Sequence, residues 1–166
     1  FIEFAKSEGQ EVVKKTKYVP ITFDIPPPPP SPPILAVLKG LFPGKKINPN
    51  KVEQLAVSIR FETNSSEFDF KARSDVDRVR GYLNANFKGD VKTGIAVLGH
   101  TDNRGGPQIN APLSKDRAEE VMQDVRGDLK DIGILGLGEQ MPVDTNETEE
   151  GRAKNRRAEI WIVEFE

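Results

Sequence analysis

Two oppositely charged side chains, Asp102 and Arg117, have the types and spacing expected of a site for a small charged group. Asp102 lies in the polar segment 99–105 (GHTDNRG), directly after the apolar run 95–98. In α/β folds ligands bind at the carboxyl ends of buried strands, which is where this segment falls. Arg117 follows 15 residues later, four before Val121, which predicts a position at the edge of a helix's apolar stripe. A carboxylate and a guanidinium close together match a group that carries both an ammonium and a carboxylate.

The same two residues also allow a purely structural interpretation. Asp102 and Arg117 could form an internal ion pair that fixes the loop to the helix, and the residues alone leave this alternative open. His100 is the single histidine and lies at a strand end. We expect it to be a structural residue and not a catalyst.

A third charged element, the segment GRAKNRR, is expected to form a basic loop that leads into the last predicted strand. We expect Arg152 and Lys154 to lie on a solvated face. Arg157 is expected to be mainly structural, in an ion pair with a nearby acid. For Asn155 and Arg156 the functional and the structural interpretations both remain open.

Other chemistries fit the sequence poorly. His100, Asp102 and Ser114 supply the residue types of a hydrolase triad, but His100 and Asp102 are two positions apart on one extended segment, and no Gly-x-Ser-x-Gly motif exists. No ligand pair has the usual metal-site spacing, no phosphate-binding loop is complete, and the chain has no cysteine. We therefore expect a binding protein with no catalytic activity, no metal and no cofactor.

The elements that position these residues follow from hydrophobic periodicity. Ser74 and Asp77 resemble a helix capping box, and the spacing of the apolar residues after them predicts a helix. The expected elements are a strand at 57–61, a helix at 74–87, a strand at 95–98, a helix whose apolar face runs from Ala118 to Leu129, a short strand at 134–138 and a strand at 158–163. This β-α-β-α-β-β order predicts an α/β (α+β) sandwich with the helices on one side of a mixed sheet.

The first 50 residues differ from the rest. Residues 1–25 contain an alternating stretch, which predicts an edge strand or the tail of an upstream domain. Residues 26–50 are expected to be a Pro-rich linker, with a polyproline II rod over seven prolines and a short apolar helical turn. The rod could also bind an aromatic groove of a partner, although a spacer is the preferred interpretation. Residues 51–166 are the predicted globular domain.

Composition limits the possible partners and location. The net charge of −2 has the wrong sign for a protein held mainly by phosphate contacts, so nucleic acid is not an expected partner. No stretch reaches the roughly 20 apolar residues that span a bilayer. The chain starts at Phe1 without a signal sequence, which we interpret as a removed targeting peptide or a fragment of a longer protein.

Several motifs together resemble one known family. These are GHTDNRG (99–105), NAPLSKDRA (110–118), GLGE (136–139), PV (142–143) and the stretch from NET at 146–148 to GRAKNRR at 151–157. They are similar to the OmpA-like peptidoglycan-binding domain, which also occurs in peptidoglycan-associated lipoproteins and in the stator B proteins of flagellar motors. The resemblance extends over roughly residues 52–163.

The resemblance implies a function and a site. It implies non-covalent binding of the peptidoglycan stem peptide at meso-diaminopimelate, with Asp102 taking the ligand ammonium and Arg117 its carboxylate. Lysine at the same stem position lacks that carboxylate and is expected to bind more weakly. The remaining site residues implied by position are Thr101, Asn103 and Asn110 as lining or backbone donors, Leu113 and Ser114 packed beside them, and Asn155 and Arg156 at the rim.

The resemblance also implies a cellular role. We expect a periplasmic protein of a Gram-negative bacterium that anchors an outer-membrane or periplasmic assembly to the cell wall, attached to the outer membrane through an upstream region or a partner. The alternative is a protein–protein interaction module of the same fold that does not bind peptidoglycan. We also expect Arg117→Ala to weaken binding and leave the fold intact, because an edge side chain leaves no central cavity. Arg104 and Gly105–Gly106 depart from the family pattern in a variable loop.

Overall fold

The computed structural model describes residues 32–68, 70–87 and 92–166. Helices and strands alternate along this part of the chain. In chain order they are α3 (Pro32–Leu41), β1 (Ile47–Arg60), α4 (Phe70–Asn86), β2 (Thr93–Gly99), α5 (Pro107–Val125), β3 (Asp131–Gly136), α6 (Glu149–Asn155) and β4 (Arg157–Phe165).

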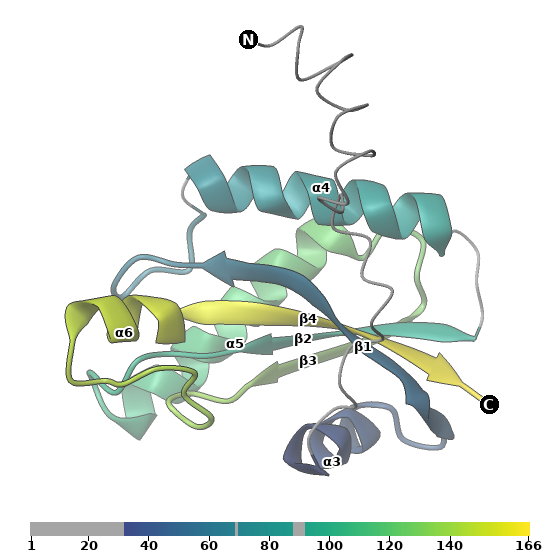
Figure 1. Ribbon diagram of the computed structural model, residues 1–166, viewed down its shortest axis with the longest axis horizontal. Helices are drawn as coiled ribbons and strands as arrows, with labels where there is room; N and C mark the ends of the chain where they lie inside the picture. The colour runs from purple at the N-terminus through teal and green to yellow at the C-terminus, as the bar shows by residue number, and fades with distance from the viewer. Residues whose placement is uncertain (1–31, 69, 88–91) are drawn as a thin grey trace, which may run out of the picture.

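The four strands form one mixed sheet in the order β1-β4-β2-β3. β4 runs antiparallel to both of its neighbours, β1 and β2, while β2 and β3 are parallel. Every residue of β2 is buried, as its continuous apolar sequence predicts for an inner strand. The predicted α/β fold is therefore confirmed, and the carboxyl ends of β2 and β3 lie at the same edge of the sheet (Figure 1).

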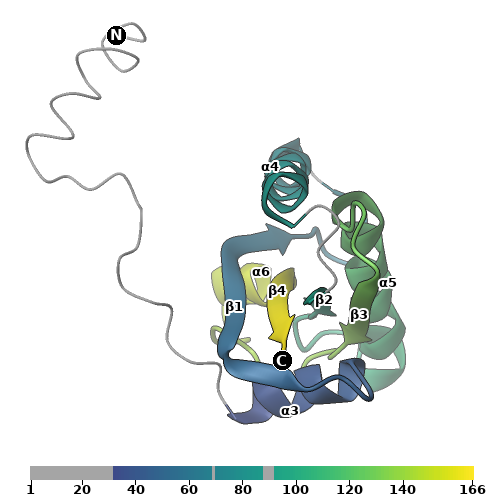
Figure 2. The same cartoon turned by 90° about the vertical axis from the view of Figure 1, so that its right-hand side faces the viewer.

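The two predicted helices, α4 and α5, lie on one face of the sheet as expected, and α3 covers the other face. One core cluster joins α4 and α5 to side chains such as Ile59, Val97 and Ile160. On the opposite face Leu38 of α3 packs with Leu98 and other apolar residues of β2 and β4. Figure 2 shows α4 and α3 on opposite sides of the strands. Strand residues alternate between the faces, so two helical layers bury both sets.

Some predicted boundaries differ from the structure. α4 begins at Phe70, so Ser74 lies inside the helix and the predicted capping box is wrong. Leu129 joins the core from beyond the end of α5. The basic segment before β4 was expected as a loop, but most of it forms α6, whose first turn carries two glutamates and whose N-cap Thr148 accepts a bond from the Gly151 amide. A capping hydroxyl and acidic residues in the first turn both favour a helix start.

The N-terminal part of the described chain belongs to the folded unit. Pro32 and Pro33 open α3, where a proline loses no helical hydrogen bond, so these two are not part of an extended rod. The predicted domain boundary at residue 51 lies inside β1, which begins at Ile47. The edge strand predicted within residues 1–25 and the rest of the proline run lie outside the described residues. Among the described helices, none is long and apolar enough to cross a bilayer.

Candidate functional site

The loop after β2 is tied to the end of β3 by backbone hydrogen bonds. The amide of Thr101 donates to the carbonyl of Gly138 (2.8 Å), and the amide of Leu137 donates to the carbonyl of Gly99 (2.9 Å). Asp102 then turns the chain, because its Oδ1 accepts a bond from the Arg104 amide (3.0 Å). The Asp102 carboxylate is thereby held at the carboxyl edge of the sheet, in a residue with only 4% of its surface exposed.

Asp102 forms a buried ion pair with Arg156, the residue that follows α6. The Nη1 atom of Arg156 lies 2.9 Å from Asp102 Oδ2. Its Nε donates to the Phe61 carbonyl (3.3 Å), which connects α6 to the end of β1. Burial lowers the pKa of Arg156, but bonds to Asp102 and Glu149 outweigh it and hold the pKa above its usual value. Both interpretations of Arg156 were open in the sequence, and the structure brings it into contact with Asp102.

Arg117 is completely buried, which agrees with its predicted place beside the apolar stripe and away from the solvated face of α5. Its guanidinium donates to the carbonyls of Ser65 (2.9 Å), His100 (3.0 Å) and Glu62 (2.9 Å). It also lies over the Phe61 ring, 5.0 Å from the centroid. Arg117 thus joins α5 to the end of β2 and to the turn after β1.

The electrostatic surroundings of Arg117 follow from this burial. Desolvation lowers its pKa to about 10, the Asp102 carboxylate opposes this, and the Arg156 guanidinium adds to it. Arg117 therefore remains a cation at neutral pH. The sequence left open an ion pair between Asp102 and Arg117. Among the described residues Asp102 pairs with Arg156 instead.

Helix α5 packs very closely against the ends of β2 and β3. A Cβ atom at Gly99 would lie 1.8 Å from the Ser114 carbonyl oxygen, which no side chain tolerates. The buried Ser114 hydroxyl donates to the Ala111 carbonyl (2.8 Å) and accepts from the Gly138 amide (2.9 Å). Ser114 therefore joins helix and strand, and this contact brings Arg117, one helical turn later, to the end of β2.

The other predicted residues of this edge fall into different environments. Asn110 is buried and donates from Nδ2 to the Asp102 carbonyl (3.2 Å) and to Glu139 (2.9 Å). Thr101 is buried, and its hydroxyl has no hydrogen-bond partner among the described residues. Asn103 is exposed and Leu113 is half-buried.

Asn155 organises the loop before α6. Its Oδ1 accepts from the amides of Val143 (2.8 Å) and Asp144 (3.1 Å), while Nδ2 donates to the Asp144 carbonyl (2.8 Å) and Asn146 Oδ1 (3.0 Å). Asn155 has no exposed surface, and these four bonds hold the loop in place. None of the hydrogen bonds between described residues joins Asn155 to Asp102. Lys154 pairs with Asp144 at 2.7 Å.

Arg157 and His100 belong to a separate buried network. Arg157 pairs with Glu159 at 2.6 Å, as the predicted structural ion pair requires. His100 lies against the same glutamate, with 3.8 Å between Nε2 and Oε1. Desolvation, followed by the nearby Arg157 cation, lowers the pKa of His100 to about 4 despite Glu159. His100 is therefore neutral at pH 7.

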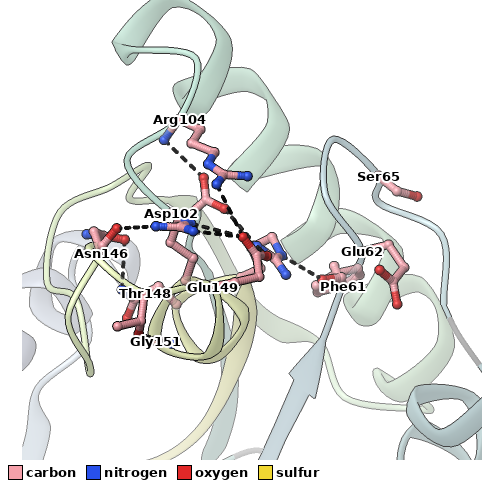
Figure 3. Close-up of polar contacts among 12 residues, drawn as sticks. Phe61, Glu62, Ser65, Asp102, Arg104, Asn146, Thr148, Glu149 and Gly151 are labelled. Atoms are coloured by element: carbon pink, nitrogen blue, oxygen red, sulfur yellow. Dashed lines mark hydrogen bonds and ion pairs between the residues drawn. The ribbon is translucent and has the colours of Figure 1, made fainter.

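One residue of the site, Glu149, was not predicted from the sequence. Its carboxylate accepts from Arg156 (3.0 Å) and Arg152 (3.0 and 3.1 Å) and lies 3.3 Å from Arg104. Figure 3 shows Glu149 close to Asp102 and to the side chain of Arg104. Arg152 is also bonded to the Asn146 carbonyl and its side chain is only 12% exposed, so its predicted solvated position is wrong. Only the acidic first turn of α6 could have indicated Glu149.

Two alternatives to the charged cluster around Asp102 are a metal cluster and a groove elsewhere on the domain. No group of three or more His, Cys, Asp or Glu side chains that could hold a metal is found in the described ranges. A shallow groove beside β1 and α4, lined by Ser58, Lys71 and Asp75, contains none of the predicted site residues. The buried charges gathered around Asp102 therefore define the candidate site.

Comparison with known proteins places the chain in a family. The model of the OmpA family matches residues 60–156, more than half of the chain, and the protein belongs to this family. The matched range includes the end of β1, the loop around Asp102, Arg117 and α6. The family suggested by the sequence motifs is thus confirmed.

Individual relatives agree with this. The peptidoglycan-binding protein ArfA of Mycobacterium tuberculosis is 46% identical over 73 residues, which are 41% of this chain and 22% of ArfA. The structure of the cell wall anchor of the type VI secretion system (T6SS) from Pseudomonas aeruginosa has a TM-score of 0.56 at 29% identity, covering 83% of this chain and 99% of that one. The C-terminal domain of Helicobacter pylori MotB, at 23% identity and a TM-score of 0.57 over 64% of this chain and 83% of its own, shares the fold. The chain thus spans about a fifth of the length of ArfA.

Proposed function

We propose that this domain binds peptidoglycan non-covalently at the meso-diaminopimelate of the stem peptide, and so anchors an envelope assembly to the cell wall. The observation that carries the proposal is the buried Asp102 carboxylate, held at the end of β2 beside the guanidinium of Arg156 and near that of Arg117. Membership of the OmpA family supports the proposal, as do the names of relatives, which include a peptidoglycan-binding protein and a cell wall anchor.

The donors and acceptors that remain at the site suit the zwitterionic end of diaminopimelate. A carboxylate offers about four lone-pair positions, and Asp102 uses one on each oxygen, for the Arg104 amide and for Arg156. The others can accept from the ligand ammonium. A guanidinium has about five N–H donors, so Arg117 keeps two after its three carbonyl bonds, which can donate to the ligand carboxylate.

The cellular role follows from this binding. We infer that the protein acts in the periplasm of a Gram-negative bacterium, attached to the outer membrane through an upstream region or a partner. It catalyses no reaction in this role, because capture of the wall needs only complementary charges and hydrogen bonds.

Retention on purified sacculi with diaminopimelate-type stem peptides tests the proposal. Wild-type protein is expected to sediment with the sacculi. Asp102→Asn keeps the shape of the side chain but removes the anion that pairs with the ligand ammonium, so it is expected to stay in the supernatant. The matched control is Asp116→Asn, on an exposed position of α5. Failure of the folded wild-type protein to sediment would refute wall binding and make the protein–protein interaction module the better interpretation.

A further inference from the structure

Glu149 is the most exposed member of the charged cluster. Its side chain is 56% exposed and that of Arg104 is 53% exposed, whereas the side chains of Asp102 and Arg156 beneath them are 6% and 7% exposed. A ligand that approaches Asp102 from solvent therefore meets Glu149 and Arg104 first. These two side chains connect the loop after β2 to the first turn of α6 (Figure 3).

The Nη1 group of Arg156 is shared between two carboxylates. One is Asp102, at 2.9 Å, and the other is Glu149, at 3.0 Å. Nη1 carries two N–H donors, so each carboxylate takes one and none is left for a ligand. Glu149 thus occupies the Nη1 donor beside Asp102 that an incoming carboxylate could otherwise accept from.

The guanidinium groups around Glu149 make this position a site for an anion. Arg104, Arg152 and Arg156 all approach its carboxylate within 3.3 Å. Hydrogen bonds from Arg152 and then from Arg156 hold the pKa of Glu149 below its usual value, so the group is an anion at neutral pH. Charged donors of this kind bind a free carboxylate in the same way as a side-chain carboxylate.

We propose that Glu149 is a built-in competitor for the ligand carboxylate: it closes the site in the free protein, and the stem peptide displaces it. On binding, Glu149 releases Arg156 and turns to solvent, the ligand carboxylate accepts from Arg156 and Arg117, and the ligand ammonium reaches Asp102. The proposal rests on the proposed function, because it assigns the control of access to that same site.

The size of the effect follows from the exposure of Glu149. Ion pairs at such exposed positions are weak, so breaking those of Glu149 when the site opens reduces the ligand affinity only modestly. Removing the competitor is expected to tighten binding by about twofold to fivefold. The gain appears in the dissociation constant and leaves the fold unchanged, because the buried Asp102–Arg156 pair stays intact.

The experiment is a calorimetric titration of the domain with a diaminopimelate stem peptide, using Glu149→Gln, Glu149→Asp and Glu147→Gln. Glu147 is the matched control: it is exposed, lies two residues before Glu149, and takes part in none of the ion pairs of the described residues. Glu149→Asp keeps the charge but shortens the side chain by one methylene, so its carboxylate no longer reaches Arg156. We expect Glu149→Gln and Glu149→Asp to bind more tightly than the wild type, and Glu147→Gln to bind equally.

The outcomes separate the two proposals. If the wild type binds and Glu149→Gln binds equally or more weakly, Glu149 is not a competitor. The proposed function then still stands. A different result is that Glu149→Gln binds more tightly while Glu149→Asp does not, or that Glu147→Gln shows the same increase in affinity. Either result indicates a general effect of charge and also refutes the competitor role of Glu149. If neither the wild type nor any folded variant binds, the proposed function fails, and the competitor fails with it.

Discussion

Replacing Arg117 tests how the site is built into the fold. In Arg117→Ala the carbonyls of Glu62, Ser65 and His100 lose their donor, and the Phe61 ring loses its cation. Hydrogen bonds to charged groups contribute about 1.5 to 3 kcal/mol each, but the variant also avoids the cost of burying a guanidinium. Removal of one partner from a buried charged network costs about 3 to 5 kcal/mol, and we expect a decrease of that size in the free energy of unfolding.

Urea denaturation followed by circular dichroism measures this decrease. The matched control is Arg78→Ala on α4, whose side chain is 70% exposed and pairs with Asp75 one turn away. It is expected to change the stability by no more than about 0.5 kcal/mol. A decrease below about 1 kcal/mol in Arg117→Ala would show that the buried guanidinium contributes little to the fold. The expectation from the sequence, that Arg117→Ala leaves the fold intact, would then be correct.

The remaining predictions concern the core, the buried histidine and the loop before α6. A Cβ at Gly81 inside α4 would meet open space, so Gly81→Ala is expected to stabilise the protein by about 0.5 to 1 kcal/mol. Gly99→Ala places a Cβ against the Ser114 carbonyl and is expected to prevent folding. Thermal melts compare the two variants. His100 has a folded pKa of about 4 against 6.5 unfolded, so the unfolded state takes up a proton first as the pH falls. Stability is therefore expected to fall by about 3 kcal/mol between pH 6.5 and 4. Proton NMR of the single imidazole checks the pKa, and a value near 6.5 would contradict the burial argument. Asn155→Ala leaves two loop amides without their acceptor and is expected to cost about 1 to 3 kcal/mol, with hydrogen exchange accelerating at residues 143 and 144; unchanged exchange there would contradict its role.

Much of the fold was predictable because its elements have strong local signals. The apolar run 95–98 correctly predicted the inner strand β2, and the alternation at 158–163 correctly predicted β4. The polar segment that directly follows the run 95–98 was thereby also placed correctly at the end of β2. α3 was less predictable, because a short apolar helix carries no signal for the face of the sheet on which it packs.

The site was only partly predictable. Periodicity places Arg117 at the border of the apolar stripe, but its burial depends on carbonyls of the turn after β1, more than 50 residues away in the sequence. The pairing of Asp102 with Arg156 depends likewise on a contact between residues 54 positions apart. Glu149 could not be predicted, because a glutamate in a polar stretch is usually an ordinary surface residue. Its role depends on three arginines that only the fold brings around it.

The central claim is that this domain recognises the ammonium and carboxylate at the end of diaminopimelate. The most direct measurement is a calorimetric titration of the wild-type domain with a meso-diaminopimelate stem peptide and with the matched lysine stem peptide. We predict saturable binding of the first and much weaker binding of the second, because lysine lacks the carboxylate that Arg117 and Arg156 would hold. Equal affinity for the two peptides, or no binding of either by the folded domain, would contradict the claim.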